Sequence, residues 1–89
     1  MKLRALDISE ANSYIKRILT NDPILYNLKV KGEISNFKHN SRGHFYFTLK
    51  DDNASISVTM FSTFAKTVKF EPKDGMKVFV KGNVTVYEP

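Results

Sequence analysis

Residues 44–61 read HFYFTLKDDNASISVTMF, two runs of alternating apolar and polar residues separated by a polar turn. Successive side chains of a strand point to opposite faces, so each run predicts a strand with one buried face. The three residues 51–53 between them have the composition of a tight turn and predict an antiparallel hairpin. The apolar positions are Phe45, Phe47 and Leu49 in the first strand and Ile56, Val58 and Met60 in the second.

Two elements are predicted on the N-terminal side of the hairpin. The helical spacing of apolar residues predicts an amphipathic helix from about residue 8 to residue 20, with a capping box that starts at Asp7. Residues 28–37 alternate again and predict a strand, in which Gly32 indicates a bulge or a sharp bend. Residues 38–43 predict a polar, basic loop. The apolar stripe of the helix is expected to join the core, and it consists of Ala11, Tyr14, Ile15, Ile18 and Leu19.

The C-terminal side of the hairpin is expected to add a short helix and one long strand. Residues 64–68 have helical spacing, and residues 72–75, which read PKDG, predict a turn. Residues 76–87 alternate apolar and polar side chains over a long strand that Gly82 interrupts.

The order of these elements is typical of one fold class. Long strands interrupted by glycine, with a helix between the third and fourth strands, favour an OB-fold, mainly β with α, in which an N-terminal helix precedes a Greek-key β-barrel. The fifth strand of such a barrel would follow Pro89, so it is expected to be missing from this chain. Residues 1–24 are interpreted as an N-terminal helical segment and residues 25–89 as the OB-fold nucleic-acid-binding domain, truncated before that strand. The length of 89 residues suits one small domain.

The composition is basic and contains no cysteine. Lys and Arg number 14 against 9 Asp and Glu, a formal net charge of +5, and basic domains often bind polyanions. The absence of cysteine excludes disulfides, thiolate catalysis and cysteine-based zinc sites. No apolar stretch approaches the length of a membrane span, and the N-terminus lacks the apolar run of a signal peptide. A cytoplasmic protein without membrane contact is therefore expected.

The positive charge is concentrated in one quarter of the chain. Residues 29–50 hold five Lys or Arg and one acidic residue, Glu33, and so carry four of the five net positive charges. Aromatic residues interleaved with these cations favour single-stranded nucleic acid, because stacking on an exposed ring contributes about 1–3 kcal/mol per unpaired base. The candidate DNA-binding residues are Lys29, Lys31, Phe37, Lys38, His39, Arg42, His44, Tyr46, Thr48, Lys50 and Phe61.

Several of these candidates also have a purely structural interpretation. Phe37 and Phe61 lie at strand ends, where their rings can fill the end of a barrel. Lys29 and Lys31 can be solvated edge charges that prevent strand-to-strand aggregation. Tyr46 is the stronger binding candidate, because alternation places it opposite the apolar face of its strand.

No catalytic, metal or cofactor site is predicted. Asp51 and Asp52 are adjacent carboxylates, but turn chemistry explains them, and a two-metal nuclease site needs carboxylates that converge from a rigid pocket. His39 and His44 flank a flexible loop and have no partnered acid. We therefore expect a binding module without enzymatic activity of its own.

Four segments of the chain are distinctive in combination. They are VKGEISNF at residues 30–37, GHFYFTLKD at 43–51, KFEPKDGMKV at 69–78 and GNVTVYEP at 82–89. With the opening helix, they resemble the N-terminal part of the exodeoxyribonuclease VII large-subunit family, and the resemblance covers essentially the whole chain. The chain departs from that family at Ser55 and Ser57, where basic residues are common, so phosphate contacts are expected on residues 29–50.

The resemblance implies a role for this chain within a longer subunit. It implies that an N-terminal OB-fold domain binds single-stranded DNA, that a central domain holds the nuclease site, and that a helical C-terminal region recruits many copies of a small subunit. The assembled hydrolase would cut single-stranded DNA from either end into short oligonucleotides, without strict dependence on a metal ion. This chain would deliver single strands to the nuclease domain, and the small subunit would bind through the absent C-terminal region.

Two alternative functions are compatible with the same sequence. Without a fifth strand, the first and last strands, residues 28–37 and 76–87, would have unpaired edges, and open edges recruit other strands. The chain would then act as an assembly or gating module, and this fragment would form a strand-paired or swapped homodimer. The other alternative is an RNA-binding OB-fold domain, although no residue in the sequence indicates recognition of a 2′-hydroxyl.

Overall fold

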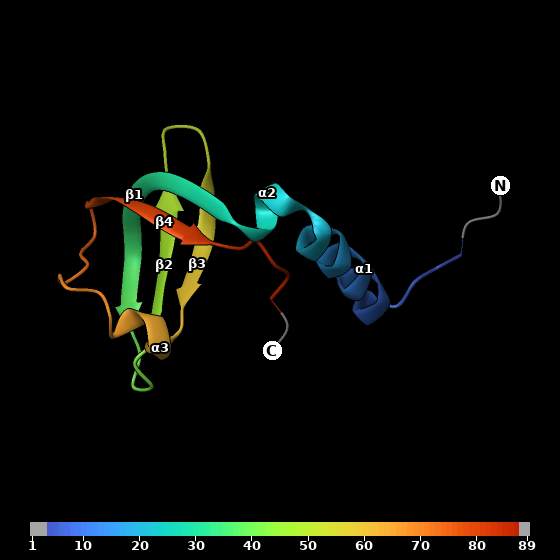
Figure 1. Cartoon of the computed structure of the whole chain (residues 1–89), viewed down its shortest axis with the longest axis horizontal. Coiled ribbons are helices and arrows are strands. Elements are labelled where there is room, and N and C mark those ends of the chain that lie inside the picture. The colour runs from blue at the N-terminus through green and yellow to red at the C-terminus, as the bar shows by residue number, and fades with distance from the viewer. Residues whose placement is uncertain (1–3, 88–89) are drawn as a thin grey trace. The chain divides into compact units, whose positions relative to one another are not determined.

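The computed structural model describes residues 4–87. Its elements are, in chain order, α1 (Ile8–Asn21), α2 (Pro23–Tyr26), β1 (Leu28–His39), β2 (Phe45–Lys50), β3 (Ser55–Met60), α3 (Ser62–Ala65) and β4 (Lys77–Gly82) (Figure 1). The chain divides into two compact units, one formed by the residues up to Lys29 and from Val80 onward, the other by Val30–Phe79. The outermost residues of the two predicted segments, 1–3 and 88–89, lie outside the described range.

The unit Val30–Phe79 is built around the β2–β3 hairpin that the sequence predicts. The two strands are antiparallel, and each apolar residue of β2 stands opposite an apolar residue of β3. The pairs are Phe45 with Met60, Phe47 with Val58 and Leu49 with Ile56. The β2 side chains on this face are buried, as are Ile34 and Ala65. The buried face predicted for β2 is confirmed, and the core lies on this side of the hairpin. In β3 the predicted face is less covered, since Val58 and Met60 are half-buried and Ile56 is exposed.

The hairpin turn is held by the carboxylate of Asp51. Its Oδ1 accepts hydrogen bonds from the backbone N–H groups of Asn53 and Ala54, each at 2.9 Å. These two bonds stabilise the ionised form and lower the pKa of Asp51 from its ordinary value of 3.8. The predicted turn role of this carboxylate is therefore confirmed.

We expect the stability of the fold to depend on the charge of Asp51. Its folded-state pKa lies below the unfolded value, so the carboxylate stabilises the fold above about pH 4. This contribution is lost as the pH falls through the folded-state pKa. Asp51→Asn removes the titration, so its urea midpoint should lie below that of the wild type at neutral pH and approach it in acid. Asn53→Ala alters the same turn without altering its charge. The difference between its urea midpoint and that of the wild type should therefore not vary with pH. Equal midpoints for wild type and Asp51→Asn at neutral pH would contradict this prediction.

The free edges of the sheet differ from those predicted. The strand order is β3-β2-β1-β4, so β1 has a neighbour on both sides, and the free edges among the described strands are those of β3 and β4. The start of β4 comes alongside β1 because the N–H of Ile34 donates to the carbonyl of Met76 at 2.8 Å. The expectation of an unpaired edge on the first strand is therefore wrong, whereas that for the last strand agrees with the structure.

The last strand is shorter than its apolar alternation predicts. β4 ends at Gly82 and does not continue to Tyr87. A glycine weakens a strand interior, since it loses more backbone entropy and has no side chain to pack. Beyond it, the N–H of Val84 donates to the carbonyl of Leu25 in α2 at 3.0 Å. A bond to a helical turn thus replaces the expected continuation of the ladder.

The helical turn α2 is an element that the sequence does not predict, because Asp22 and Pro23 look like a helix stop. Asp22 caps this turn, since its Oδ1 accepts hydrogen bonds from the N–H groups of Ile24 and Leu25 at 2.9 and 3.1 Å. Pro23 takes one of the first helical positions, where its missing N–H and fixed φ are favourable. The residues that end α1 therefore also start α2.

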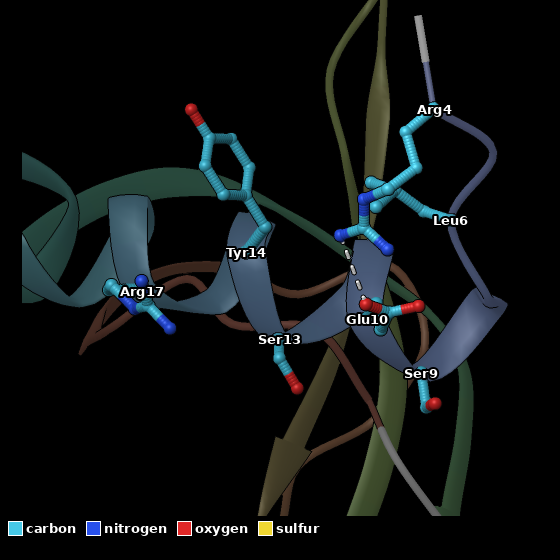
Figure 2. A pocket seen from close by; sticks show the side chains of 7 residues that line it. All are labelled: Arg4, Leu6, Ser9, Glu10, Ser13, Tyr14 and Arg17. Carbon is cyan, nitrogen blue, oxygen red and sulfur yellow. Dashed lines mark hydrogen bonds and ion pairs between the residues drawn. The ribbon is translucent and has the colours of Figure 1, made fainter.

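α1 forms as predicted, but its apolar stripe is not buried: Tyr14, Ile15 and Ile18 are exposed, and Ala11 and Leu19 are half-buried. Glu10 accepts a hydrogen bond from the N–H of Asp7 at 3.1 Å and forms an ion pair with Arg4 at 3.2 Å (Figure 2). No residue of α1 is buried, and Tyr14 is 60% exposed, with its ring projecting from the helix beside an open pocket (Figure 2). Within its own compact unit, the expectation that this stripe is buried is therefore wrong. Amphipathic spacing decides which face of a helix is apolar, but it does not decide what covers that face.

Candidate nucleic-acid interface

A β-bulge in β1 decides which of its side chains face outward. The two residues Asn36 and Phe37 stand opposite the single residue Phe47 of β2, and Asn36 has a left-handed conformation with a φ of 54°. One extra residue reverses the alternation of every position that follows it. The register pairs on the outward face are Glu33 with Lys50 and Ser35 with Thr48 before the bulge, and Lys38 with Tyr46 after it.

The bulge moves Phe37 and His39 to the core side of the strand. The centroid of the Phe37 ring lies 5.0 Å from that of Phe45 and 6.2 Å from that of Phe47. The His39 ring lies edge to face with Phe45, at a centroid distance of 4.8 Å. These contacts support the structural interpretation of Phe37, in which its ring fills the barrel. Lys38, between the two rings in sequence, faces outward.

The bulge is anchored by a carboxylate from the turn before β4. Asp74 Oδ1 accepts a hydrogen bond from the N–H of Phe37 at 2.9 Å, across 37 positions of sequence. The next residue, Gly75, has a φ of 90° and donates its N–H to the carbonyl of Ile34 at 2.8 Å. A bulged residue leaves the strand ladder, so its N–H needs another acceptor, and the Asp74 carboxylate supplies one.

We expect Asp74→Ala to destabilise the fold by about 1 kcal/mol, because it leaves the N–H of the bulge without its acceptor. Asp74→Asn keeps an acceptor oxygen and should recover most of this stability. Urea unfolding measures both effects, and the Phe37 amide should exchange its hydrogen faster in the alanine variant. Lys73→Ala, at the preceding position of the same turn, is the control for turn composition. Unchanged protection of the Phe37 amide in Asp74→Ala would show that the anchor is unimportant.

The outward face of β1 and β2 combines cations with a tyrosine. Lys38 is exposed and stands opposite Tyr46, which is 37% exposed. Lys31 lies two positions before Glu33 in the same strand and so projects to the same face. Lys50 also lies on this face, but its Nζ is 3.8 Å from a carboxylate oxygen of Glu33. The charge of Lys50 is therefore partly neutralised within the face.

β3 continues this face with small hydroxyl side chains. Thr59 stands opposite Tyr46, and the two serines stand opposite the next two outward positions of β2. All three are exposed, and side chains of this size leave the neighbouring tyrosine ring accessible. The pairs are Thr59 with Tyr46, Ser57 with Thr48 and Ser55 with Lys50.

Three aromatic rings, which we name the aromatic cluster, gather where β2 begins: His44, Tyr46 and Phe61. The His44 ring lies edge to face with Tyr46 at 6.3 Å and with Phe61 at 5.4 Å. His44 Nδ1 accepts a hydrogen bond from the N–H of Ser62 at 2.9 Å, so the neutral ring carries its proton on Nε2. This bond fixes the imidazole against the first residue of α3.

An outward sheet face of this kind is where OB barrels bind single strands. Residues 6–89 match a family model described as an OB-fold nucleic acid binding domain. The chain belongs to this family. The fold class predicted from the sequence is thereby confirmed. Within residues 4–87, the elements that match this fold are an N-terminal helix, four antiparallel strands and a short helix between the third and fourth strands.

The OB-fold domain is also similar in sequence to exodeoxyribonuclease 7 large subunits, which confirms the resemblance predicted from its motifs. It is 58% identical over 89 residues to that of Clostridioides difficile, 52% over 88 residues to that of Alkaliphilus metalliredigens, and 54% over 87 residues to that of Clostridium acetobutylicum. These alignments cover 99%, 99% and 98% of this chain and 22% of each relative. The chain therefore spans about a fifth of the length of the curated relatives it matches.

The OB-fold domain brings most of the predicted binding residues into one area. The outward face holds Lys31, Lys38, Tyr46, Thr48 and Lys50, the aromatic cluster adds His44 and Phe61, and the loop before β2 holds Arg42. Phe37 and His39 lie on the core side, and Lys29 belongs to the other compact unit. Asp74 makes a structural contact in this area but is not among the predicted residues. It is a turn-forming side chain directly before a glycine, a signal that indicates its turn.

Within residues 4–87, no group of three or more His, Cys, Asp or Glu side chains is arranged to hold a metal ion. None of the helices in that range is long and apolar enough to cross a membrane.

Proposed function

We propose that this OB-fold domain binds single-stranded DNA on its outward face and delivers it to a nuclease domain. The observation that carries the proposal is the register pair of Lys38 and Tyr46 on one exposed face, with the aromatic cluster at its end. This pairing sets a phosphate-binding cation beside a ring that stacks on a base. A single strand exposes both its phosphates and its base faces, so it is the nucleic acid that uses both groups at once.

Each group on the face has a distinct role in this proposal. Tyr46 is the central stacking ring, and Phe61, which is 58% exposed, extends the stacking surface beyond His44. Lys50 contributes less than the other cations, because Glu33 shares its charge. Neutralising a phosphate releases condensed counterions, and this release drives the binding. The phosphate-binding residues are Lys31, Lys38 and Arg42.

The preference for single strands follows from base stacking. In a duplex both faces of a base are covered by its neighbours, so a ring on the protein surface has no free base to contact. The preference for DNA over RNA is supported by the similarity to relatives that are named exodeoxyribonucleases. A hydroxyl-rich β3 without cations is consistent with phosphate contacts limited to β1, β2 and the loop between them.

We further propose that the chain is the DNA-binding part of a cytoplasmic exonuclease large subunit. Because the aligned segment is 22% of each relative, nuclease chemistry and binding of a small subunit are assigned to the remainder of such a protein. A tethered binding module raises the effective concentration of single strands near a nuclease site without taking part in hydrolysis. The OB-fold domain would thus lower the DNA concentration needed for cleavage while leaving the chemical step unchanged.

Fluorescence anisotropy of a labelled oligo-dT, titrated with the chain at several salt concentrations, tests the binding proposal. For three or four neutralised phosphates, log K should fall with log salt concentration with a slope of about −2 to −3. Duplex DNA should compete poorly, and RNA of the same sequence is the competitor that tests the alternative RNA-binding function. No binding at low salt, or an affinity independent of salt, would contradict the proposal. Stronger competition by RNA would assign the face to RNA.

A further inference from the structure

The loop Asn40–His44, which joins β1 to β2, is closed by hydrogen bonds of its first residue. On the backbone, the N–H of Asn40 donates to the carbonyl of His44, and the carbonyl of Asn40 accepts from the N–H of Gly43, both at 3.0 Å. On the side chain, Oδ1 of Asn40 accepts from the N–H of Arg42 at 3.0 Å and from that of His44 at 2.9 Å. The sequence predicts a flexible basic loop, whereas these four bonds make it an ordered one.

The side-chain amide of Asn40 also reaches the aromatic cluster. Its Nδ2 donates to Tyr46 Oη in a long hydrogen bond of 3.5 Å. Asparagine is suited to both tasks, because one planar amide carries an acceptor oxygen and a donor nitrogen. An aspartate at this position would keep the acceptor, lose the donor and place a negative charge among the cations.

The other end of the loop is fixed by α3. Gly43 has a φ of 86°, and a Cβ at this position would lie 3.2 Å from the Cβ of Ser62. The bond from the N–H of Ser62 to His44 Nδ1 holds the last residue of the loop. In Figure 1 the loop lies at the same end of the hairpin as α3. Arg42 is thus an exposed cation on a loop that is held at both ends.

We propose that Asn40 is a positioning residue of the nucleic-acid interface, which pre-organises Arg42 and His44 for binding. This inference rests on the proposed function, and it adds a residue that acts on affinity through others. A loop that is disordered in the free chain must lose backbone entropy when it binds, and this loss lowers affinity. The hydrogen bonds of Asn40 impose that order before the DNA arrives.

A double-mutant cycle on oligo-dT binding tests the inference, with wild type, Asn40→Ala, Arg42→Ala and the double variant. Asn40→Ala should weaken binding about tenfold, which corresponds to the entropy of ordering about one backbone residue. To the extent that the disordered Arg42 no longer reaches its phosphate, the magnitude of the salt slope should also fall, by at most about 0.7, the value of one phosphate contact on a single strand. Because Asn40 acts in part through Arg42, Arg42→Ala should cost much less affinity in the Asn40→Ala background than in the wild type.

Two controls separate positioning from a general loss of structure. Asn53→Ala makes the same change in the turn at the opposite end of the hairpin, and it should leave affinity and salt slope unchanged. Hydrogen exchange of the Arg42 and His44 amides, measured without DNA, should become faster in Asn40→Ala and stay unchanged in Asn53→Ala. Asn40→Asp, which keeps the acceptor oxygen, should restore the protection of both amides.

The outcomes distinguish this inference from the function on which it rests. Additive effects of Asn40→Ala and Arg42→Ala on affinity, or unchanged amide exchange in Asn40→Ala, would overturn the inference while the proposed function stands. A wild-type chain that does not bind oligo-dT at low salt would remove the proposed function, and the inference with it.

Discussion

Tyr46→Ala is expected to weaken the binding of oligo-dT by about tenfold to a hundredfold. Stacking of one base on an aromatic ring contributes about 1–3 kcal/mol, and each 1.4 kcal/mol changes a dissociation constant about tenfold. Tyr46 should have the largest effect on this face, because it is the exposed ring between Lys38 of β1 and Thr59 of β3. Fluorescence anisotropy at one low salt concentration measures the loss. The salt slope should stay that of the wild type, since no cation is removed.

Two further variants separate the ring of Tyr46 from other effects of the substitution. Tyr46→Phe keeps the ring and loses the hydroxyl that Asn40 contacts, so its affinity should remain much closer to that of the wild type. Tyr26→Ala removes a tyrosine of α2 that is 59% exposed, and it should not change the affinity. If Tyr46→Phe lost as much affinity as Tyr46→Ala, the hydroxyl would carry the interaction, and base stacking on this ring would be ruled out.

The hairpin was predictable because its determinants are local. Alternation in β2 and β3 places Phe47 and Val58 on one face without reference to any other part of the chain. The carboxylate of Asp51 closes its turn on N–H groups two and three residues ahead. The same locality makes Tyr46 recognisable as an outward residue. The position of each of these side chains therefore follows from a short stretch of sequence.

The outward position of Lys38 was not predictable in the same way, because it depends on a contact distant in sequence. Unbroken alternation from Lys31 would place Phe37 on the outward face, next to the binding residues. The bulge reverses this arrangement, and it is held by Asp74, 37 residues further along the chain. The predicted burial of the apolar stripe of α1, which includes Tyr14, is wrong for a related reason. A helical pattern contains no information about the surface that packs against the helix.

Leu49→Ala is expected to destabilise the fold by about 2–5 kcal/mol, because it removes buried methyl groups and leaves a cavity. Leu49 is 4% exposed and stands between its register partners, Ile34 of β1 and Ile56 of β3. A natural domain has only about 5–15 kcal/mol of stability in total, so the urea midpoint should fall sharply. Leu49→Met nearly conserves volume and should cost less than about 1.5 kcal/mol. Since Leu49 and Tyr46 project to opposite faces, the folded fraction of Leu49→Ala should keep its DNA affinity.

The same leucine explains why residue 32 is a glycine. A Cβ on Gly32 would lie 2.8 Å from Leu49 Cγ and 2.8 Å from the carbonyl oxygen of Lys50, so Gly32→Ala should cost about 1–3 kcal/mol through overpacking. In the double variant, Leu49→Ala removes the clash with the side chain and leaves the clash with the backbone. The double variant should therefore lose less unfolding free energy than the two single variants together, and the difference should be part of the loss caused by Gly32→Ala alone. Strict additivity would mean that β1 shifts away from β2 to admit the methyl group, and that Leu49 does not set the close approach of the two strands.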